Sequence, residues 1–392
     1  MRTGQAPFTP APAKAMKVDV CVVGAGIAGL TTAYMLLLEG KSVAVLDNEP
    51  MGFGETEDAT IHLTTALDHR YCELERLYGE QGSRLAAQSH TAALSCLEAI
   101  VAKENIDCDF ERVDGFLLVP PDASPGLLER ELAAAHRAGL TGVQSISRAP
   151  LASYDTGPCL RFPQQAQFHP EKYLGGLAQI IRQKGGRIFS GTQVARIGGG
   201  PLAWVETRAG SLVMADAVVL ATNTPVYDLV AVPAKLPPSR TYVIGTRVPA
   251  GSAPRALYWD TGRPRHSVRL DRLPVGRWSE EAYDLLIVGG EEHQIGIADN
   301  ADARWGRLEE WARQRFPMIS GVEYRWSGEV LEPPDGLAFI GRTPTAKPNV
   351  YFTAGYSPVA GLLLADLICG RENEWAGRYD PSRSRLSASP NF

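Results

Sequence analysis

Two apolar runs near the start of the chain are separated by a helical pattern. The run VDVCVVG (residues 18–24) is almost continuously apolar and ends in glycine, which is typical of a buried parallel strand. Residues 27–40, IAGLTTAYMLLLEG, have the apolar spacing of a helix and also end in glycine. Residues 41–47, KSVAVLD, form a second apolar run. This order predicts a β-α-β unit.

The same patterns recur along the rest of the chain. Helical spacing predicts two helices within 68–105 and one helix in each of three later segments, 169–184, 303–317 and 359–370. Strand-like runs occupy 110–119, 187–197, 210–224 and 349–356. Between 239 and 300, short alternating runs are separated by turn residues, which favours an antiparallel sheet. We expect no regular element from residue 373 onwards.

The segments that resemble buried parallel strands lie at the start, middle and end of the chain, and antiparallel patterns fill the gaps. We therefore expect an α/β fold with two interleaved domains. The expected division is a disordered tail at 1–15, a discontinuous nucleotide-binding domain at 16–80, 160–235 and 330–372, a substrate domain at 81–159 and 236–329, and a C-terminal tail at 373–392.

Composition excludes several classes of function. The chain has 392 residues, 44% of them hydrophobic and 21% charged, and its net charge of −5 does not favour nucleic acid as a partner. No apolar run reaches the roughly 18–20 residues of a membrane span. The six cysteines form no C-x-x-C pair and the seven histidines are isolated, so we expect reduced thiols and no metal site. With no signal-peptide pattern, the expected location is cytoplasmic.

Three glycines between the first strand and the first helix form a G-x-G-x-x-G motif. Gly24 permits a tight turn, Gly26 lets the backbone approach a pyrophosphate, and Gly29 lets the helix pack closely on the sheet. The helix N-terminus then faces the phosphate charge. Asp47 ends the second strand, where its carboxylate can accept both ribose hydroxyls. The motif predicts a dinucleotide site but fits FAD and NAD equally.

A family resemblance separates these two cofactors. The stretches VVGAGIAGLTTAYML, GETEDATIHLTTALDHRY, AVVLATNT, RWSGEVLEPPDGLAFIG and GRENEWAGRYDPSR resemble the D-amino-acid oxidase superfamily of FAD-dependent oxidoreductases. More narrowly, the chain is similar to a branch that usually carries a C-terminal Rieske iron–sulfur domain. The resemblance implies a Rossmann-like FAD-binding lobe beside an antiparallel-sheet substrate lobe. It also implies oxidation of a C–N bond by hydride transfer to flavin.

The same resemblance implies the residues that bind FAD. They are Gly24, Gly26, Ile27, Ala28, Gly29, Asp47, Asn48, Thr56, His62, Leu63, Thr64, Val194, Thr222, Gly341, Gly355, Pro358, Val359, Ala360 and Gly361. Some members of the superfamily attach flavin through a histidine near the position of His62. We expect non-covalent FAD here.

The chain departs from the family pattern at four places. Glu57 and Asp58 replace a glycine and a base in the flavin loop, and the loop at 355–361 is shortened and lacks a histidine. No C-x-H…C-x-x-H pattern exists to bind a Rieske cluster, so electrons are expected to pass to oxygen or to a separate acceptor. Val330 stands roughly where amino-acid oxidases place the arginine that binds the substrate carboxylate.

Candidate catalytic residues come from the antiparallel segment and the shortened loop: Tyr258, His266, Arg269, His293 and Tyr356. Because of Val330, an amine, an N-substituted amino acid or a larger specialised metabolite is favoured as the substrate over a simple α-amino acid. Two alternatives stay open. One is a dehydrogenase that feeds a separate iron–sulfur or quinone partner, and the other is a flavin-binding protein that has lost redox turnover. The oligomeric state is not predicted.

Overall fold

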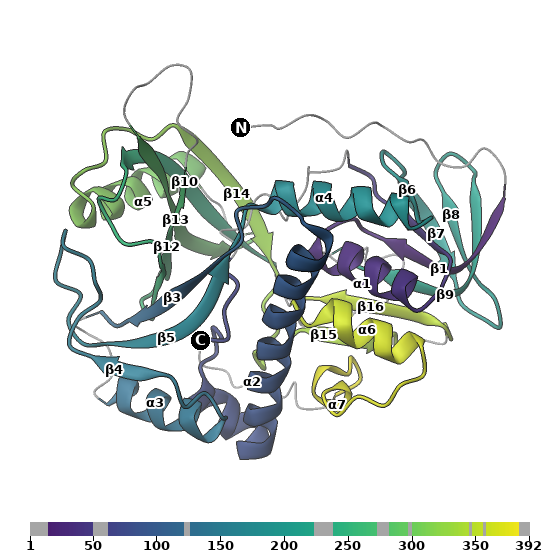
Figure 1. Cartoon of the computed structure of the whole chain (residues 1–392), viewed down its shortest axis with the longest axis horizontal. Helices are drawn as coiled ribbons and strands as arrows, with labels where there is room; N and C mark the ends of the chain where they lie inside the picture. The colour runs from purple at the N-terminus through teal and green to yellow at the C-terminus, as the bar shows by residue number, and fades with distance from the viewer. Residues whose placement is uncertain are drawn as a thin grey trace.

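The computed structural model describes residues 15–49, 62–120, 126–222, 238–272, 282–296, 300–344, 347–355 and 358–383. Two eight-stranded sheets stand apart on either side of the long helix α2 (Tyr71–Glu104), as Figure 1 shows. Each sheet collects segments from distant parts of the sequence, as the interleaved patterns predict.

The first sheet contains the expected β-α-β unit. Its main order is β15-β16-β9-β1-β2-β6, and the β7–β8 hairpin pairs with β9. Strands β1, β2, β6, β9 and β16 run parallel, and β15 joins the edge antiparallel. The bounds are β1 Met16–Val23, β2 Val43–Leu46, β6 Arg187–Phe189, β7 Val194–Gly198, β8 Ala203–Thr207, β9 Leu212–Leu220, β15 Phe339–Arg342 and β16 Val350–Ala354.

This sheet is covered on both faces, which explains its continuous apolar runs. Along β1, Val20 and Val22 belong to the core under the helices, whereas Cys21 and Val23 belong to a core on the opposite face. Helix α1 (Ile27–Leu38) packs between α4 (Pro170–Gln183) and α6 (Ala360–Ile368).

The second sheet forms the other lobe, in the order β14-β10-β13-β12-β11-β3-β5-β4. Its strands are antiparallel except for β11 and β3, which pair in parallel, so the sheet is mixed. Helix α5 (Ala301–Arg315) packs on one face, and α3 (Leu127–Arg137) packs against α2. The bounds are β3 Glu111–Leu118, β4 Gln144–Ile146, β5 Cys159–Gln167, β10 Ser239–Pro249, β11 Leu257–Asp260, β12 His266–Arg272, β13 Tyr283–Gln294 and β14 Tyr324–Val330.

Three local features differ from the sequence pattern. Strand β5 starts where we expected the nucleotide-binding domain to resume, yet it pairs with β3 and β4 of the second sheet. The two helices expected within 68–105 are the two parts of α2, which meet at Gly79, where φ is +73°. A short helix, α7 (Ala376–Tyr379), lies in the tail for which no element was expected, because Tyr379 is buried against α2.

Candidate functional site

At Gly24 and Gly29, around the turn after β1, only glycine fits. Gly24 has φ +108°, and a Cβ there would lie 2.4 Å from the carbonyl oxygen of Ala221 at the end of β9. A Cβ at Gly29 would lie 2.0 Å from the carbonyl oxygen of Gly24. The chain therefore passes tightly between two strand ends and directly into α1, with its backbone accessible at the turn.

The N-terminus of α1 can receive a phosphate. Gly26 is its N-cap residue, the first turn holds no acidic residue, and no side chain among the described residues caps the helix. The N–H groups at this end carry a partial positive charge that favours an anion. Because the glycine turn also keeps the approach clear of side chains, these residues fit the pyrophosphate of a dinucleotide.

Asp47 connects the end of β2 to the glycine turn. Its Oδ2 accepts from the backbone N–H of Ala25 at 2.5 Å, and its Oδ1 accepts from the N–H of Glu49 at 2.8 Å. Burial raises the pKa of Asp47, and these two hydrogen bonds oppose that rise. Each carboxylate oxygen keeps a second lone pair, so Asp47 can still accept ribose hydroxyls.

Other predicted cofactor-binding residues surround this turn. Thr222 follows β9, and its backbone nitrogen lies 3.2 Å from the Cβ position of Gly24. Ile27 and Ala28 begin α1, and Asn48 is exposed beside Asp47. Val194 is half-buried in β7 and packs against the core that contains the end of β2.

The segment after the flavin loop joins the two sheets. Leu63 and Ala166 of β5 exchange backbone hydrogen bonds of 3.1 and 2.9 Å. Gln165 of β5 accepts from the hydroxyl of Thr64 at 2.7 Å and from the N–H of Thr65 at 2.6 Å. His62 is thereby held at the junction of the lobes, where the resemblance places the flavin. Thr56, Glu57 and Asp58 lie outside the described residues.

The C-terminal group of predicted FAD-binding residues follows β15 and β16. Gly355 ends β16 with φ +88°, and a Cβ there would lie 3.2 Å from Cδ of Pro333. Pro358 and Val359 lead into α6, whose first residues are Ala360 and Gly361. Gly361 allows close packing on α1, since its Cβ would lie 2.4 Å from Cγ2 of Thr31. A Cβ at Gly341 would lie 2.8 Å from Cδ of Pro381 in the C-terminal segment.

The candidate catalytic residues do not form one cluster. Tyr258 stacks on Phe116, with ring centroids 5.4 Å apart, and both belong to the core beneath α5. His266 accepts or donates at Nδ1 with Asp260 at 3.2 Å and stacks on Trp311 of α5 at 4.2 Å. These residues lie on the α5 face of the second sheet, so the sequence-based grouping with Arg269 does not hold.

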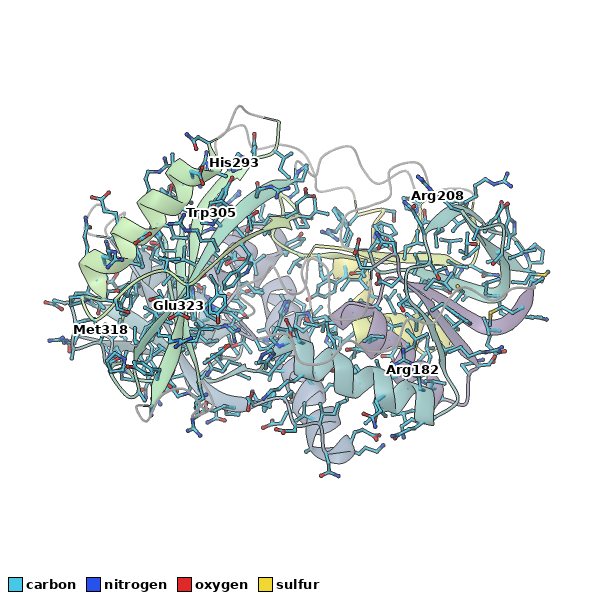
Figure 2. The ribbon with its side chains drawn as sticks, turned by 90° about the horizontal axis from the view of Figure 1, so that it is seen from above. Arg182, Arg208, His293, Trp305, Met318 and Glu323 are labelled. Atoms are coloured by element: carbon cyan, nitrogen blue, oxygen red, sulfur yellow. The ribbon has the colours of Figure 1, made fainter. Side chains whose placement is uncertain are left out.

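His293 also lies on the α5 side. Its ring stacks on Tyr242 at 5.8 Å, and Tyr242 in turn meets Trp305 of α5 at 5.4 Å. Figure 2 shows His293 and Trp305 in the lobe of the second sheet, next to α5. Tyr356 lies outside the described residues.

Arg269 alone of the described candidates faces the opposite side. On β12 it is separated by three positions from His266, which reverses the face in an alternating strand. Its side chain is buried, donates from Nη1 to the carbonyl of Phe168 at 3.3 Å, and lies 3.0 Å from Asp271. Burial and the nearby Arg269 charge lower the pKa of His62 to about 3, so His62 is neutral at physiological pH.

Sequence reasoning missed several residues on this face. Trp259 lies edge-on to His62 with ring centroids 6.3 Å apart, and Gln167 donates from Nε2 to the carbonyl of Leu270 at 3.0 Å. Alternation along β11 and along β5 indicates which side chains of each strand share a face. Only the pairing of β5 with the second sheet shows that Trp259 and Gln167 lie on the same face of one sheet.

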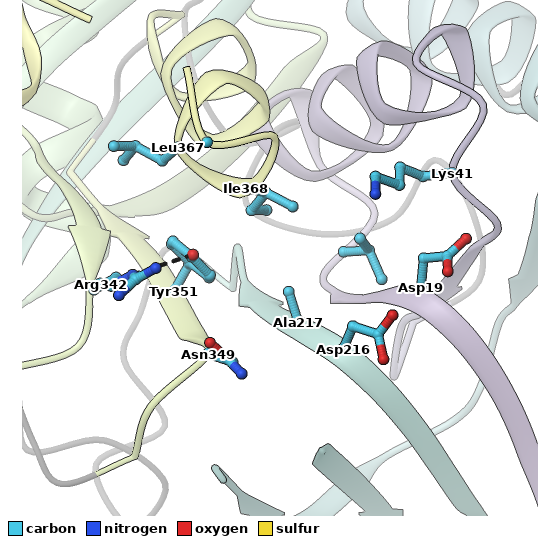
Figure 3. Close-up of a pocket in the computed structure, with 11 residues that line it drawn as sticks. Asp19, Lys41, Asp216, Ala217, Arg342, Asn349, Tyr351, Leu367 and Ile368 are labelled. Atoms are coloured by element: carbon cyan, nitrogen blue, oxygen red, sulfur yellow. Dashed lines mark hydrogen bonds between the residues drawn. The ribbon is translucent and has the colours of Figure 1, made fainter. Parts of the chain in front are cut away.

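A cavity of about 200 Å³ lies elsewhere, at the opposite end of the first sheet (Figure 3). It is lined by Asp19 near the start of β1, Lys41 after α1, Asp216 of β9 and the end of α6. Because the glycine turn follows the other end of β1, this cavity is separate from the nucleotide site.

In the described parts of the chain, no cluster of histidine, cysteine, aspartate or glutamate could hold a metal ion. No helix there could cross a membrane.

Comparisons with known proteins agree with this geometry. A protein of Bacillus subtilis named as a Rieske 2Fe-2S iron–sulfur protein, YhfW, is 27% identical over 97% of this chain and 74% of its own length. Gamma-glutamylputrescine oxidoreductase of Escherichia coli is 27% identical over 90% of this chain and 84% of its own.

Among solved structures, glycine oxidase of Geobacillus kaustophilus superposes with a TM-score of 0.76 at 20% identity, covering 94% of this chain and 99% of its own. This likeness confirms the expected fold of two lobes. The model of the family described as FAD dependent oxidoreductase, DAO, matches residues 19–369. The chain therefore belongs to the DAO family of FAD-dependent oxidoreductases, and its cofactor is FAD.

Proposed function

We propose that the protein oxidises a C–N bond of an amine, an N-substituted amino acid or a larger amine-containing metabolite. The observation that carries the proposal is the face of the second sheet opposite α5, where Trp259 lies edge-on to His62 and the Arg269 charge reaches the same ring. FAD held at the turn of Gly24 and Gly26 and by Asp47 would supply an acceptor for the hydride of the carbon next to nitrogen, and the imine left on the substrate would be open to hydrolysis by water.

The residues on this face have roles that suit an amine. Trp259 and Phe162, with ring centroids 6.0 Å apart, supply an apolar wall that excludes water. The buried Arg269 cation disfavours a second positive charge nearby, and so favours the neutral form of the amine, which is the form that releases hydride. His62, being neutral, adds no repulsion.

A simple α-amino acid fits this face less well. Val330 ends β14 on the same face as Arg269. It pairs with Ser239, alternation along β10 puts Ser239 and Gly245 on one face, and Gly245 and Arg269 both pair with Ile287 of β13. No cation stands at position 330 to bind a carboxylate on the reacting carbon. Arg325, which is nearest in the sequence, instead donates to Glu309 of α5 at 3.2 Å.

The test is spectroscopic. Purified protein loaded with FAD is mixed without oxygen with secondary and primary amines, N-methylated amino acids, glycine and D-alanine. We expect the flavin absorbance to bleach with an amine or N-methylated compound, and slowly with glycine or D-alanine. Rapid reoxidation in air supports an oxidase, whereas reoxidation only by an added acceptor supports the dehydrogenase alternative. If no compound bleaches the flavin, the protein is a flavin-binding protein without turnover.

We further expect FAD to be held without a covalent bond. Acid precipitation should release all of the yellow colour into the supernatant, and His62→Ala should leave that release unchanged. Colour that stays with the wild-type pellet but not with the His62→Ala pellet would assign a covalent link to His62.

A further inference from the structure

Three buried polar atoms on one face of the second sheet lack a hydrogen-bond partner among the described residues. They are Nε of Arg269, Oε1 of Gln167 and Nε2 of His62. Arg269 is 3% exposed and Gln167 is 1% exposed. A buried donor or acceptor without a partner costs about 1–3 kcal/mol, and more when it is charged. Such a group, retained in a cofactor-binding enzyme, indicates a ligand that completes it.

Hydrogen bonds link the segments that carry these three atoms. The guanidinium of Arg269 donates to the carbonyl of Phe168, and Gln167 donates to the carbonyl of Leu270. His62 is held next to β5 by the backbone bridge between Leu63 and Ala166. The Arg269 charge reaches His62 strongly enough to help lower its pKa.

The guanidinium is fixed in one orientation. Nη1 is occupied by the Phe168 carbonyl and by Asp271 at 3.0 Å, which leaves the Nε edge for another acceptor. Arginine presents its N–H groups in a rigid fork that matches a carboxylate. Gln167 Oε1, which belongs to the same face of the sheet, is an acceptor and suits an N–H group of the same ligand.

We propose that Arg269 and Gln167, with His62 beside them, bind a carboxylate and an adjacent N–H group of the substrate. The substrate class is then an amine whose carboxylate stands on a carbon other than the one oxidised. This inference rests on the proposed function and deepens it. Arg269 is on β12, whereas Val330 is on β14, with β13 and β10 between them. A carboxylate bound at Arg269 is therefore held at a different place from one bound at position 330.

The equilibrium test uses two unreactive probes of equal size. Binding of butanoate and of butanamide to the FAD-loaded protein is measured from the change in flavin absorbance. In Arg269→Met we expect the dissociation constant of butanoate to rise about 10- to 100-fold, and that of butanamide to change less than about twofold. Arg269→Lys should fall between, because it keeps the charge but loses the Nε donor. Arg325→Met, on the α5 face, is the matched control and should leave both constants unchanged.

Turnover adds a second measurement. 4-(Methylamino)butanoate and N-methylbutylamine have the same methylated nitrogen and differ in the distant carboxylate. In Arg269→Met we expect KM to rise for the first compound only. Sarcosine, whose carboxylate is on the adjacent carbon, should be a poorer substrate for the wild type than 4-(methylamino)butanoate.

Other outcomes overturn the proposal. An equal effect on butanoate and butanamide would assign Arg269 a structural role. Loss of flavin from both Arg269→Met and Arg269→Lys, or an effect confined to the affinity of the flavin for sulfite, would place the cofactor against Arg269. If no amine bleaches the flavin but butanoate still binds through Arg269, the proposed function fails and the carboxylate site stands.

Discussion

At the scale of single residues, neighbouring positions have opposite roles because strands alternate. His266 and Arg269 lie on the same strand, yet one stacks on Trp311 of α5 and the other faces His62. Their spacing of three positions already indicates opposite faces. What the sequence did not indicate is which face meets His62, because that depends on the contact between β5 and the segment after residue 61.

The glycine turn allows a substitution that separates cofactor binding from folding. Gly26 has φ −74° and ψ −176°, an extended conformation that any residue adopts, unlike Gly24 with φ +108°. Gly26→Val should therefore keep the fold but block the approach of the pyrophosphate. We expect colourless protein with an unchanged far-ultraviolet circular dichroism spectrum. Stoichiometric flavin in Gly26→Val would contradict the assignment.

His90 makes the free energy of unfolding depend on pH in the acidic range. It is buried in α2, and burial lowers its pKa to about 4, although a hydrogen bond from its Nδ1 to the Ala86 carbonyl opposes this. Between pH 4 and the unfolded value near 6.5, the unfolded chain binds one more proton, so the unfolding free energy decreases as the pH falls. In His90→Gln we expect this slope to decrease by about 1.4 kcal/mol per pH unit. Urea titrations at several pH values measure it, and an unchanged slope would refute the assignment.

At the scale of elements, the C-terminal segment fixes the loop before β15. Arg383 forms a buried bidentate ion pair with Asp335, at 2.7 and 2.9 Å. It also donates to the carbonyls of Ala338 and Leu337, and its guanidinium lies 3.9 Å from the ring centroid of Phe339. The same loop contacts Gly355 through Pro333. The arrangement of the loop before β15, and of the start of β15 at Phe339, therefore depends on Arg383.

Breaking this ion pair should cost much more than breaking an exposed one. Arg383→Met leaves the Asp335 carboxylate buried without its partner, and we expect a loss of about 3–5 kcal/mol in unfolding free energy together with weaker FAD binding. The matched control is Arg371→Met, which removes half-exposed ion pairs with Asp366 and Glu39 and should cost about 1 kcal/mol or less. Equal losses in the two variants would contradict the role of Arg383.

The elements that could be predicted are those with a strong local period. The β-α-β unit and helices α4, α5 and α6 follow from apolar spacing alone, and short alternating runs indicated β10 to β13. The parallel pair of β11 and β3 could not be foreseen, because its partners Leu257 and Gly115 are distant in the sequence and carry no local signal. For the same reason Gln167 was missed as a site residue.

At the scale of the whole molecule, the proposed cofactor site draws on both lobes. The glycine turn follows β1 of the first sheet, His62 lies next to β5 of the second sheet, and Arg269 lies on β12 of that sheet. Bound FAD should therefore stabilise the two lobes together. At 100 times its dissociation constant, FAD should add about 2.7 kcal/mol to the unfolding free energy of the apoprotein. Thermal denaturation measures this gain, which Gly26→Val should lack.

The interleaving of the two sheets also determines when the protein can fold during its synthesis. Strand β9 forms its outer parallel pair with β16, whose residues Val350–Ala354 are made after the other described strands of the sheet. While the ribosome is still adding those residues, β9 presents an open edge to other chains in the cell. A premature stop before residue 350 would leave that edge permanently exposed. We therefore expect truncated chains to aggregate rather than to accumulate as folded fragments.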